Sequence, residues 1–281
     1  MHTKCTLTHK IIRGVIIKIA IMDGLTEIII HSSLAVFIYM NSWFLMAIAF
    51  KRNDLADIAW GLGFVLVATI ALADSGGANG RMILAFILVL AWGLRLAVHI
   101  FTRNRGKDED IRYRAWREQW GKTWILQTYL KVFIFQGFLL LIVIAPVYFI
   151  ATSPFNGWSW LDLSGTILWL VGFCFEAVGD WQLRRFASDP ANRGKIMDRG
   201  LWRYSRHPNY FGEVLMWWGI FVISLSTFSA WPGIIGPALI TYLILFVSGV
   251  PLLEKRYEDD PVYREYKRRT SVLFPRPPKE S

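Results

Sequence analysis

Residues 82–101 read MILAFILVLAWGLRLAVHIF, and this stretch indicates the fold class. Only Arg95 and His99 among its 20 residues are ionisable. A helix of 20 residues rises about 30 Å, which is the thickness of the hydrocarbon core of a bilayer. Lipid offers the backbone no hydrogen-bond partner, so a spanning segment must be a helix or a barrel strand, and barrel strands alternate in polarity. The uniformly apolar stretch therefore predicts a transmembrane helix.

Six further blocks have the same character. They cover residues 25–50, 55–73, 125–151, 161–179, 211–228 and 231–253. Hydrophobic residues make up 54% of the chain and charged residues 19%, below the roughly 25% typical of soluble domains. We therefore expect an all-α, polytopic membrane helix bundle of about seven transmembrane helices, in an integral, multi-pass membrane protein.

The basic residues give the expected orientation. The formal net charge is +10, from 31 Lys and Arg against 21 Asp and Glu. Seven basic residues follow the third block, seven follow the fifth and eight lie in the C-terminal tail, whereas the loops after the fourth and sixth blocks have none. By the positive-inside rule the N-terminus faces out and the C-terminus is cytoplasmic, as expected in a bacterial inner membrane. This placement of charge suggests a membrane topology signal and no nucleic-acid partner.

The first 21 residues do not fit this orientation. They carry Lys4, Lys10, Arg13 and Lys18 on the side expected to lie outside. Residues 1–21 are interpreted as a doubtful leader or as an interfacial amphipathic segment. Residues 22–281 are expected to form a single integral membrane domain, because the longest polar segments are too short for an independent core.

Ionisable residues inside the apolar blocks gather toward the expected cytoplasmic side. Residues four apart share a helix face, and an ionisable residue inside a membrane helix indicates a functional site. Three such stripes are Arg95 with His99 and Arg103, Glu176 with Asp180 and Arg184, and Asn209 with Glu213. Two alternatives are that the arginines reach the headgroups and that a helix dipole favours the histidine. The pattern predicts a cavity open to the cytoplasm.

Residues 200–213, GLWRYSRHPNYFGE, form the most informative motif. We expect Ser205 to cap a helix that begins near Pro208. Free N–H groups at a helix start favour a phosphate or another anion. The basic residues beside that start are Arg203, Arg206 and His207. A capped membrane helix with basic flanks is the plainer interpretation, but it leaves Asn209 and Glu213 inside an apolar block unexplained.

Residues 206–213, RHPNYFGE, resemble the C-terminal signature of the steroid 5-alpha-reductase-like integral membrane family, in its bacterial branch of largely uncharacterised proteins. The resemblance extends to residues 51–61, 92–96, 176–194 and 254–266. It implies a seven-helix bundle that holds NADPH in a cofactor-binding half, about residues 160–281. It also implies reduction of a carbon–carbon double bond in a lipophilic, steroid- or lipid-like enone. The implied partners are this small-molecule substrate and membrane lipids.

The resemblance also implies the site residues. Cofactor contacts are expected from polar residues of the helices and from basic residues of the cytoplasmic segments. These are Arg95, Glu176, Asp180, Arg184, Arg185, Asn192, Arg193, Arg203, Arg206, His207, Asn209, Tyr210, Glu213, Glu254, Arg256 and Tyr257. Steroid enzymes of the family use a Glu on the second helix and a Tyr on the third at the substrate. Here Asp57 takes the first position, and His99 or Tyr113 takes the second, because the third block contains no Tyr. No metal is expected, because no Cys and His cluster has zinc-ligand spacing.

Two other functions stay open. Isoprenylcysteine carboxyl methyltransferases and phospholipid N-methyltransferases share an Arg-His-Pro-x-Tyr helix start and use S-adenosylmethionine. In a methyltransferase of a lipid or isoprenyl substrate, Glu213 or Glu254 would face the sulfonium and Arg206 the carboxylate. A transporter or scaffold without a bound nucleotide is the non-enzymatic alternative.

Overall fold

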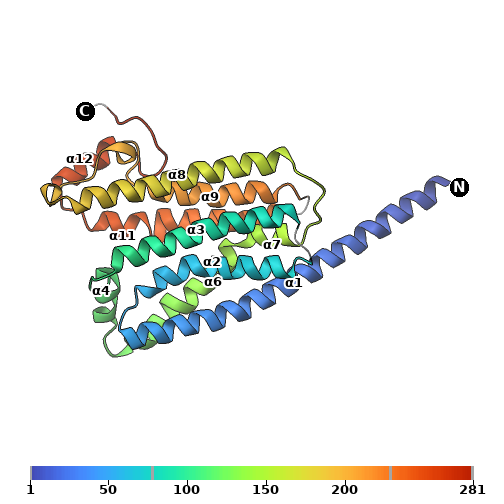
Figure 1. The fold of residues 1–281 in the computed structure, drawn as a ribbon, viewed down its shortest axis with the longest axis horizontal. Helices are drawn as coiled ribbons and strands as arrows, with labels where there is room; N and C mark the ends of the chain where they lie inside the picture. The colour runs from blue at the N-terminus through green and yellow to red at the C-terminus, as the bar shows by residue number, and fades with distance from the viewer. Residues whose placement is uncertain (1, 77–78, 228–229, 280–281) are drawn as a thin grey trace. The chain divides into compact units, whose positions relative to one another are not determined.

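The structure is a computed structural model that describes residues 2–76, 79–227 and 230–279, with side chains from Met22 onward. These residues form helices and connecting segments, with one isolated bridge and no strand. Six helical segments are long and apolar enough to cross a membrane, namely Met22–Phe50, Leu55–Asp74, Gly80–Asn104, Ile111–Val143, Trp160–Ser188 and Trp231–Lys255. The all-α, polytopic class is thereby confirmed, and the helices indicate an integral, multi-pass membrane protein (Figure 1).

The predicted block at residues 211–228 corresponds to α9 (Pro208–Ser224). Its 17 residues rise about 26 Å, which lies at the lower limit for a spanning helix. By length and composition the described residues therefore contain six spanning helices, with α9 as a shorter seventh apolar helix.

The chain forms two compact units. The first contains Met1–Trp158 and Thr227–Gly233, and the second contains Ser159–Ser226 and Ile234–Ser281. The helices of the first unit are α1 (His2–Phe50), α2 (Leu55–Asp74), α3 (Gly80–Asn104), α4 (Ile111–Trp120), η1 (Gly121–Thr123), α5 (Trp124–Gln127), η2 (Thr128–Ile134), α6 (Phe135–Val143) and α7 (Ala145–Ala151).

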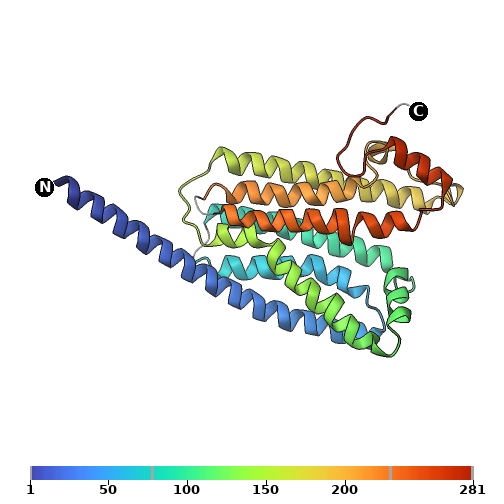
Figure 2. The same ribbon diagram turned by 180° about the vertical axis from the view of Figure 1, so that it is seen from behind.

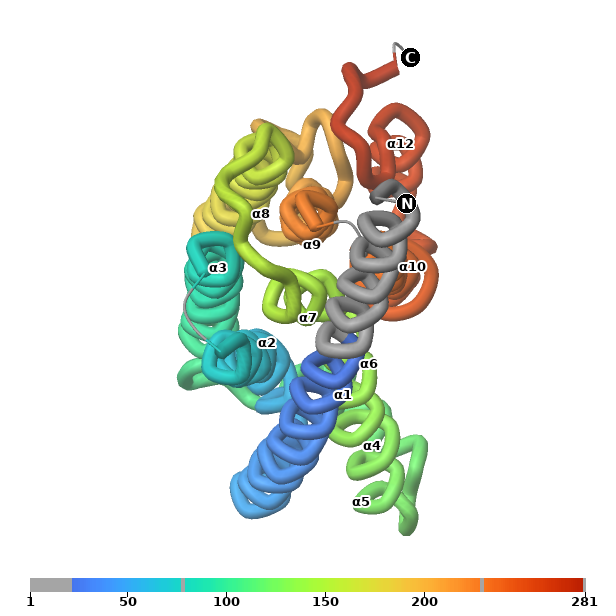
Figure 3. The backbone as a smooth tube through the Cα atoms, turned by 90° about the vertical axis from the view of Figure 1, so that its right-hand side faces the viewer, coloured from blue at the N-terminus to red at the C-terminus, as the bar shows by residue number. Residues whose placement is uncertain are grey.

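In the first unit, α2 and α3 pack with their backbones in close approach (Figure 3). A Cβ atom added at Gly93 would lie 2.6 Å from the carbonyl oxygen of Gly61. Only glycine fits such a contact, as in other close membrane helix pairs. This contact fixes the two helices that contribute Asp57 and His99.

The block predicted at residues 125–151 starts too late and is interrupted in the structure, although its predicted end is the end of α7. The helical run begins at Ile111, because Asp110 caps α4 and the polar helix continues into the apolar one. The run breaks at Ile144, and α7 starts anew with Pro146 in its first turn, a position that proline favours.

The second unit contains α8 (Trp160–Ser188), η3 (Pro190–Asn192), η4 (Gly200–Arg203), α9, α10 (Ile235–Tyr242), η6 (Leu243–Val247), α11 (Val250–Lys255) and α12 (Pro261–Arg269), with η5 (Trp231–Ile234) preceding α10 in the chain. Helices α8 and α9 lie side by side (Figures 1 and 2). A Cβ atom at Gly172 would lie 2.6 Å from the Gly212 carbonyl oxygen, and one at Gly165 would lie 2.5 Å from the Gly219 carbonyl oxygen. These glycines let the two backbones touch.

The C-terminal tail runs back along the segment that precedes α9. The backbone N–H of Arg206 donates to Ser271 O at 2.8 Å, and that of Arg276 donates to Tyr204 O at 3.0 Å. The prediction that Ser205 caps α9 is wrong. His207 occupies the N-cap position without a side-chain cap, and the Ser205 hydroxyl donates to Leu273 O at 2.7 Å. Ser205 therefore joins the tail to this segment.

Candidate functional site

In the first unit, Asp57 at the start of α2 accepts two hydrogen bonds from α4. Tyr113 Oη donates to Asp57 Oδ1 at 2.5 Å, and Arg112 Nη2 donates to Asp57 Oδ2 at 3.0 Å. Arg112 also pairs with Asp110 at 3.0 Å. Tyr113 is only 3% exposed. These four residues, here called the Asp57 cluster, bring together two of the predicted catalytic residues, Asp57 and Tyr113.

Asp110 fixes the position of Arg112 in the Asp57 cluster. Its Oδ1 accepts from the backbone N–H of Arg112 at 2.9 Å, which caps the start of α4. Burial opposes ionisation of Asp110, but the hydrogen bonds and the charge of Arg112 outweigh it and lower the pKa of this carboxyl. Asp110 therefore stays ionised and fixes the guanidinium that contacts Asp57.

A neighbouring set of contacts, which the sequence did not reveal, fixes the turn between α1 and α2. Asp54 is buried, pairs with Arg52 at 2.6 Å and accepts from Asn104 Nδ2 at 3.0 Å. Glu109 accepts from the backbone N–H of Asn53 at 2.8 Å. These bonds join the turns before α2 and after α3, so they carry α4 to Asp57. The sequence showed only that both loops contain charged residues, and this does not specify which side chains pair.

The remaining predicted site residues of the first unit are Arg95 and His99. Both lie on α3, one turn apart and partly buried. The contacts inside this unit thus define an Asp57 and Tyr113 pair, while the roles of Arg95 and His99 stay predictions.

In the second unit, Glu254 at the end of α11 is surrounded by three basic side chains. Its Oε1 lies 2.8 Å from Arg206 Nε and 3.1 Å from His207 Nε2, and its Oε2 lies 2.9 Å from Lys267 Nζ. Arg206 also donates to the carbonyl oxygens of Lys267 at 3.0 Å and Thr270 at 2.6 Å. We call Glu254, Arg206, His207 and Lys267 the Glu254 hub. It joins the start of α9, the end of α11 and α12.

In the Glu254 hub, His207 uses one ring nitrogen to contact Glu254 and leaves the other without a hydrogen-bond partner among the described residues. Its side chain is 5% exposed, and its Nδ1 is buried with no hydrogen-bond partner among the described residues. The ring stacks on Tyr210, with centroids 5.5 Å apart and planes at 19°. Glu254 therefore orients the imidazole through Nε2, and Nδ1 is available for a ligand.

The face shared by α8 and α9 carries the predicted polar pairs. Asn209 Nδ2 donates to Asp180 Oδ1 at 3.1 Å, and both Asp180 and Glu176 are buried. Glu213 lies one turn after Asn209 and is partly buried. The structure thus joins Asp180 to Asn209 and places Glu176 and Glu213 on the same helix pair.

The other predicted residues of this unit lie at its surface or in helix ends. Asn192 Nδ2 donates to Phe186 O at 3.1 Å and so terminates α8. The Arg185 guanidinium lies 5.6 Å from the centroid of the Trp181 ring. The exposed predicted residues are Arg184, Arg185, Arg193, Arg203, Arg256 and Tyr257. The contacts shown for this group do not bring its members together.

The residues of the second unit fit a phosphorylated nucleotide. A buried imidazole nitrogen without a protein partner requires a ligand or water to satisfy it. Exposed arginines suit phosphate oxygens, which they bind through paired donors. Among the described residues, no group of three or more His, Cys, Asp or Glu is arranged to hold a metal ion.

Comparisons with known proteins support the family resemblance that residues 206–213 indicate. The profile of a family described as protein of unknown function (DUF1295) matches residues 43–270. The uncharacterized protein C594.04c of Schizosaccharomyces pombe is 29% identical over 231 residues, which cover 69% of this chain and 63% of that protein. The 3-oxo-5-alpha-steroid 4-dehydrogenase 1 of Bos taurus is 31% identical over 114 residues, which cover 38% of this chain and 42% of that protein. The chain thus spans less than two thirds of the length of either relative.

Proposed function

Because the chain belongs to the DUF1295 family, which is the steroid 5-alpha-reductase-like family, we propose that it is an NADPH-dependent membrane reductase. Its proposed substrate is a lipophilic, steroid- or lipid-like enone whose carbon–carbon double bond is reduced. The similarity to a bovine steroid dehydrogenase supports a reductase in general, at 31% identity over part of the chain. The substrate class is the one that the family resemblance implies.

The observation that carries the proposal is the hydrogen bond from Tyr113 to Asp57, at 2.5 Å. Reduction of an enone places negative charge on the carbonyl oxygen, and a positioned proton donor stabilises that charge. Tyr113 is the proposed donor: when substrate binds, its single O–H proton would turn from Asp57 to the carbonyl oxygen, while Asp57 keeps its contact with Arg112. Arg112, which contacts Asp57 at 3.0 Å, supplies positive charge beside the phenol oxygen.

Residues of the second unit are proposed to hold the cofactor. Arg184, Arg185, Arg193 and Arg203 suit its phosphates, because each is exposed and permanently charged. The polar face of α8 and α9, with His207 Nδ1, suits its amide and hydroxyl groups. Arg256, Tyr257 and Tyr210 stay predicted contacts, and Asn192 is proposed to act by terminating α8. When bound, NADPH supplies the hydride.

Arg206 and Glu254 receive a different role in this proposal. The donors of Arg206 contact Glu254, Lys267 O and Thr270 O, so protein groups already occupy them. We assign both residues to positioning His207 and the start of α9.

Binding measurements test the proposal directly. The full chain, purified in detergent, would be titrated with NADPH and, in parallel, with S-adenosylmethionine. Micromolar NADPH binding that is lost in Glu213→Ala and kept in Glu265→Ala, an exposed control on α12, is the expected result. Binding of S-adenosylmethionine alone would transfer the chain to the methyltransferases, and binding of neither would leave a transporter or scaffold.

We also propose the orientation with the N-terminus outside and the C-terminus in the cytoplasm. The alternation of basic and uncharged loops supports it. A C-terminal phosphatase fusion should be inactive and a C-terminal fluorescent protein fusion should be bright, because only the first needs export. The reverse pattern would contradict this orientation.

A further inference from the structure

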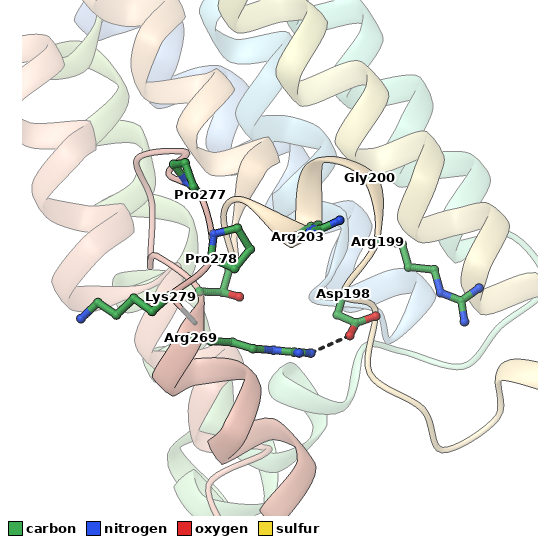
Figure 4. A pocket seen from close by; sticks show the side chains of 9 residues that line it. Asp198, Arg199, Gly200, Arg203, Arg269, Pro277, Pro278 and Lys279 are labelled. Carbon is green, nitrogen blue, oxygen red and sulfur yellow. Dashed lines mark hydrogen bonds and ion pairs between the residues drawn. The ribbon is translucent and has the colours of Figure 1, made fainter. Parts of the chain in front are cut away.

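The second unit contains a pocket of about 800 Å³ formed by the turn before η4, the end of α12 and the C-terminal tail (Figure 4). Four basic residues line it, namely Arg199, Arg203, Arg269 and Lys279, and Pro277 and Pro278 form one wall. Its volume falls in the range of about 300–1,000 Å³ that is usual for small-molecule sites. All of these residues lie outside the six helices long enough to span a membrane. A polar ligand can therefore reach the pocket from water or from the headgroup layer.

The charge of the lining selects the class of ligand. Among its described residues, Asp198 is the single acid, and its Oδ2 pairs with Arg269 Nη2 at 2.8 Å. This pair is neutral as a unit, so Arg199, Arg203 and Lys279 leave an excess of three positive charges. A phosphate monoester carries a charge of about −1.5 to −2 at neutral pH, whereas a phosphodiester carries about −1. The excess charge therefore matches a monoester better than a diester.

The side chains shown in Figure 4 indicate which residues make the first contacts. Arg269 crosses the pocket toward Asp198, and Arg203 lies on the opposite side of the hollow. The charged ends of Arg199 and Lys279 turn away from the hollow. Both of these side chains are exposed, and exposed side chains change rotamer within nanoseconds. Arg203 and Arg269 are thus the principal ligands, and the other two add attraction.

The pocket is a built feature, because backbone bonds hold its walls. Lys279 N donates to Arg269 O at 3.0 Å, and Arg276 N donates to Tyr204 O at 3.0 Å. Thr270 is buried, and its carbonyl oxygen accepts from Arg206 at 2.6 Å. The tail therefore closes the pocket against both α12 and the segment before α9.

We propose that this pocket binds a phosphate monoester, through Arg203 and Arg269. Two sources have this chemistry: the 2′-phosphate of a nucleotide such as NADPH, and the headgroup of phosphatidic acid. Their diester counterparts, NADH and phosphatidylglycerol, lack the monoester and serve as matched probes. The proposal does not depend on the reductase function, because the lipid source would fill the same pocket in a protein that binds no nucleotide.

The test uses the full chain and two pairs of probes. Fluorescence titrations in detergent compare NADPH with NADH, and nanodiscs compare phosphatidic acid with phosphatidylglycerol. The variants are Arg203→Gln with Arg269→Gln, and Asp198→Asn. The control is Arg264→Gln, which removes the same charge from an exposed position of α12 that does not line the pocket.

A hydrogen bond to a charged group contributes enough that the double variant should lose roughly tenfold or more in affinity for the monoester probe. The diester probe should change no more than it does in Arg264→Gln. Asp198→Asn should bind the monoester more tightly, a gain that misfolding cannot produce. If the double variant loses affinity for NADPH but not for NADH, the monoester belongs to a nucleotide. If it loses affinity for phosphatidic acid but not for phosphatidylglycerol, the monoester belongs to the lipid. If the double variant matches Arg264→Gln in both pairs, the proposal is overturned.

Discussion

Replacement of Glu254 by alanine should be among the most destabilising single changes in the second unit. The carboxylate contacts Arg206 at 2.8 Å, and both side chains are only 8% exposed. Removal of one partner from a buried ion pair costs about 3–5 kcal/mol, because the remaining charge is left uncompensated. Lys267 contacts the same carboxylate at 2.9 Å but is 54% exposed, so its contribution is about 0–1 kcal/mol.

Thermal unfolding of the detergent-solubilised chain measures these differences. Glu254→Ala should unfold well below the wild type, and Lys267→Ala should unfold close to it. A double-mutant cycle with Arg206→Ala should show strong non-additivity, because the second change removes the charge that the first left unpaired. Equal unfolding temperatures for Glu254→Ala and Lys267→Ala, or additive effects in the cycle, would refute the idea of a buried structural pair.

Comparison of Glu254→Ala with a further variant, Glu254→Gln, separates a positioning role of Glu254 from direct contact with the cofactor. If Glu254 acts through His207, then Glu254→Gln, which keeps the shape and one acceptor, should retain most NADPH affinity. A direct contact to the cofactor would instead make Glu254→Gln lose affinity as strongly as Glu254→Ala does. Titrations at a temperature where both variants are folded make this comparison.

Three further outcomes are expected. Tyr113→Phe should lower the reduction rate by about 10²–10⁴-fold with NADPH affinity unchanged, in single-turnover measurements; an unchanged rate would remove Tyr113 as the donor. Gly172→Val should prevent folding or lower the unfolding temperature sharply, because its Cβ would lie 2.6 Å from a carbonyl oxygen, whereas Gly24→Ala, whose Cβ would have no neighbour closer than 3.7 Å, should not. Because the pKa of Asp110 is lowered, its contribution is present above the unfolded value of 3.8 and is lost as pH falls through the folded value. Asp110→Asn keeps an acceptor for the start of α4 but removes the charge that pairs with Arg112, so it should loosen α4 by about 1 kcal/mol at pH 7, seen as faster hydrogen exchange. The difference from the wild type should shrink as pH falls through the folded pKa of Asp110.

The fold class could be predicted because the membrane restricts which backbone conformations a spanning segment can adopt. An apolar run such as residues 82–101 has few alternatives to a helix in lipid, and the structure places α3 over it. The helix ends were less predictable, since polar helices obey no such restriction. The run that starts at Ile111 carries Arg112, Arg114 and Arg117 in its first turns, so hydropathy alone placed its start too late.

The site was predictable by residue type and not by contact. The family resemblance implied Asp57 and Tyr113 separately, but helical spacing relates only neighbours on one helix and so could not pair them. Their pairing depends on the turns that carry α4 to α2, which Asp54 and Glu109 fix. The position of the C-terminal tail could not be predicted for a further reason. Some of its bonds, such as that between Arg276 and Tyr204, join two backbones and so do not depend on the side chains. The bond from Ser205 to Leu273 O uses a side chain but ends on a backbone oxygen, which every residue offers.

The Glu254 hub and the tail together bear on why an Arg-His-Pro motif stands at the start of α9. Pro208 suits the first position of α9, but His207 at the N-cap makes no side-chain cap, so this start lacks the usual capping bond. Here the segment before the helix is held from outside, by Glu254 through Arg206 and by Leu273 through Ser205. A start that is fixed in this way leaves the His207 ring free of a capping duty, with Nδ1 unpaired. Burial of an unpaired ring nitrogen is unfavourable, and the proposed contact of His207 with a ligand would supply the missing partner.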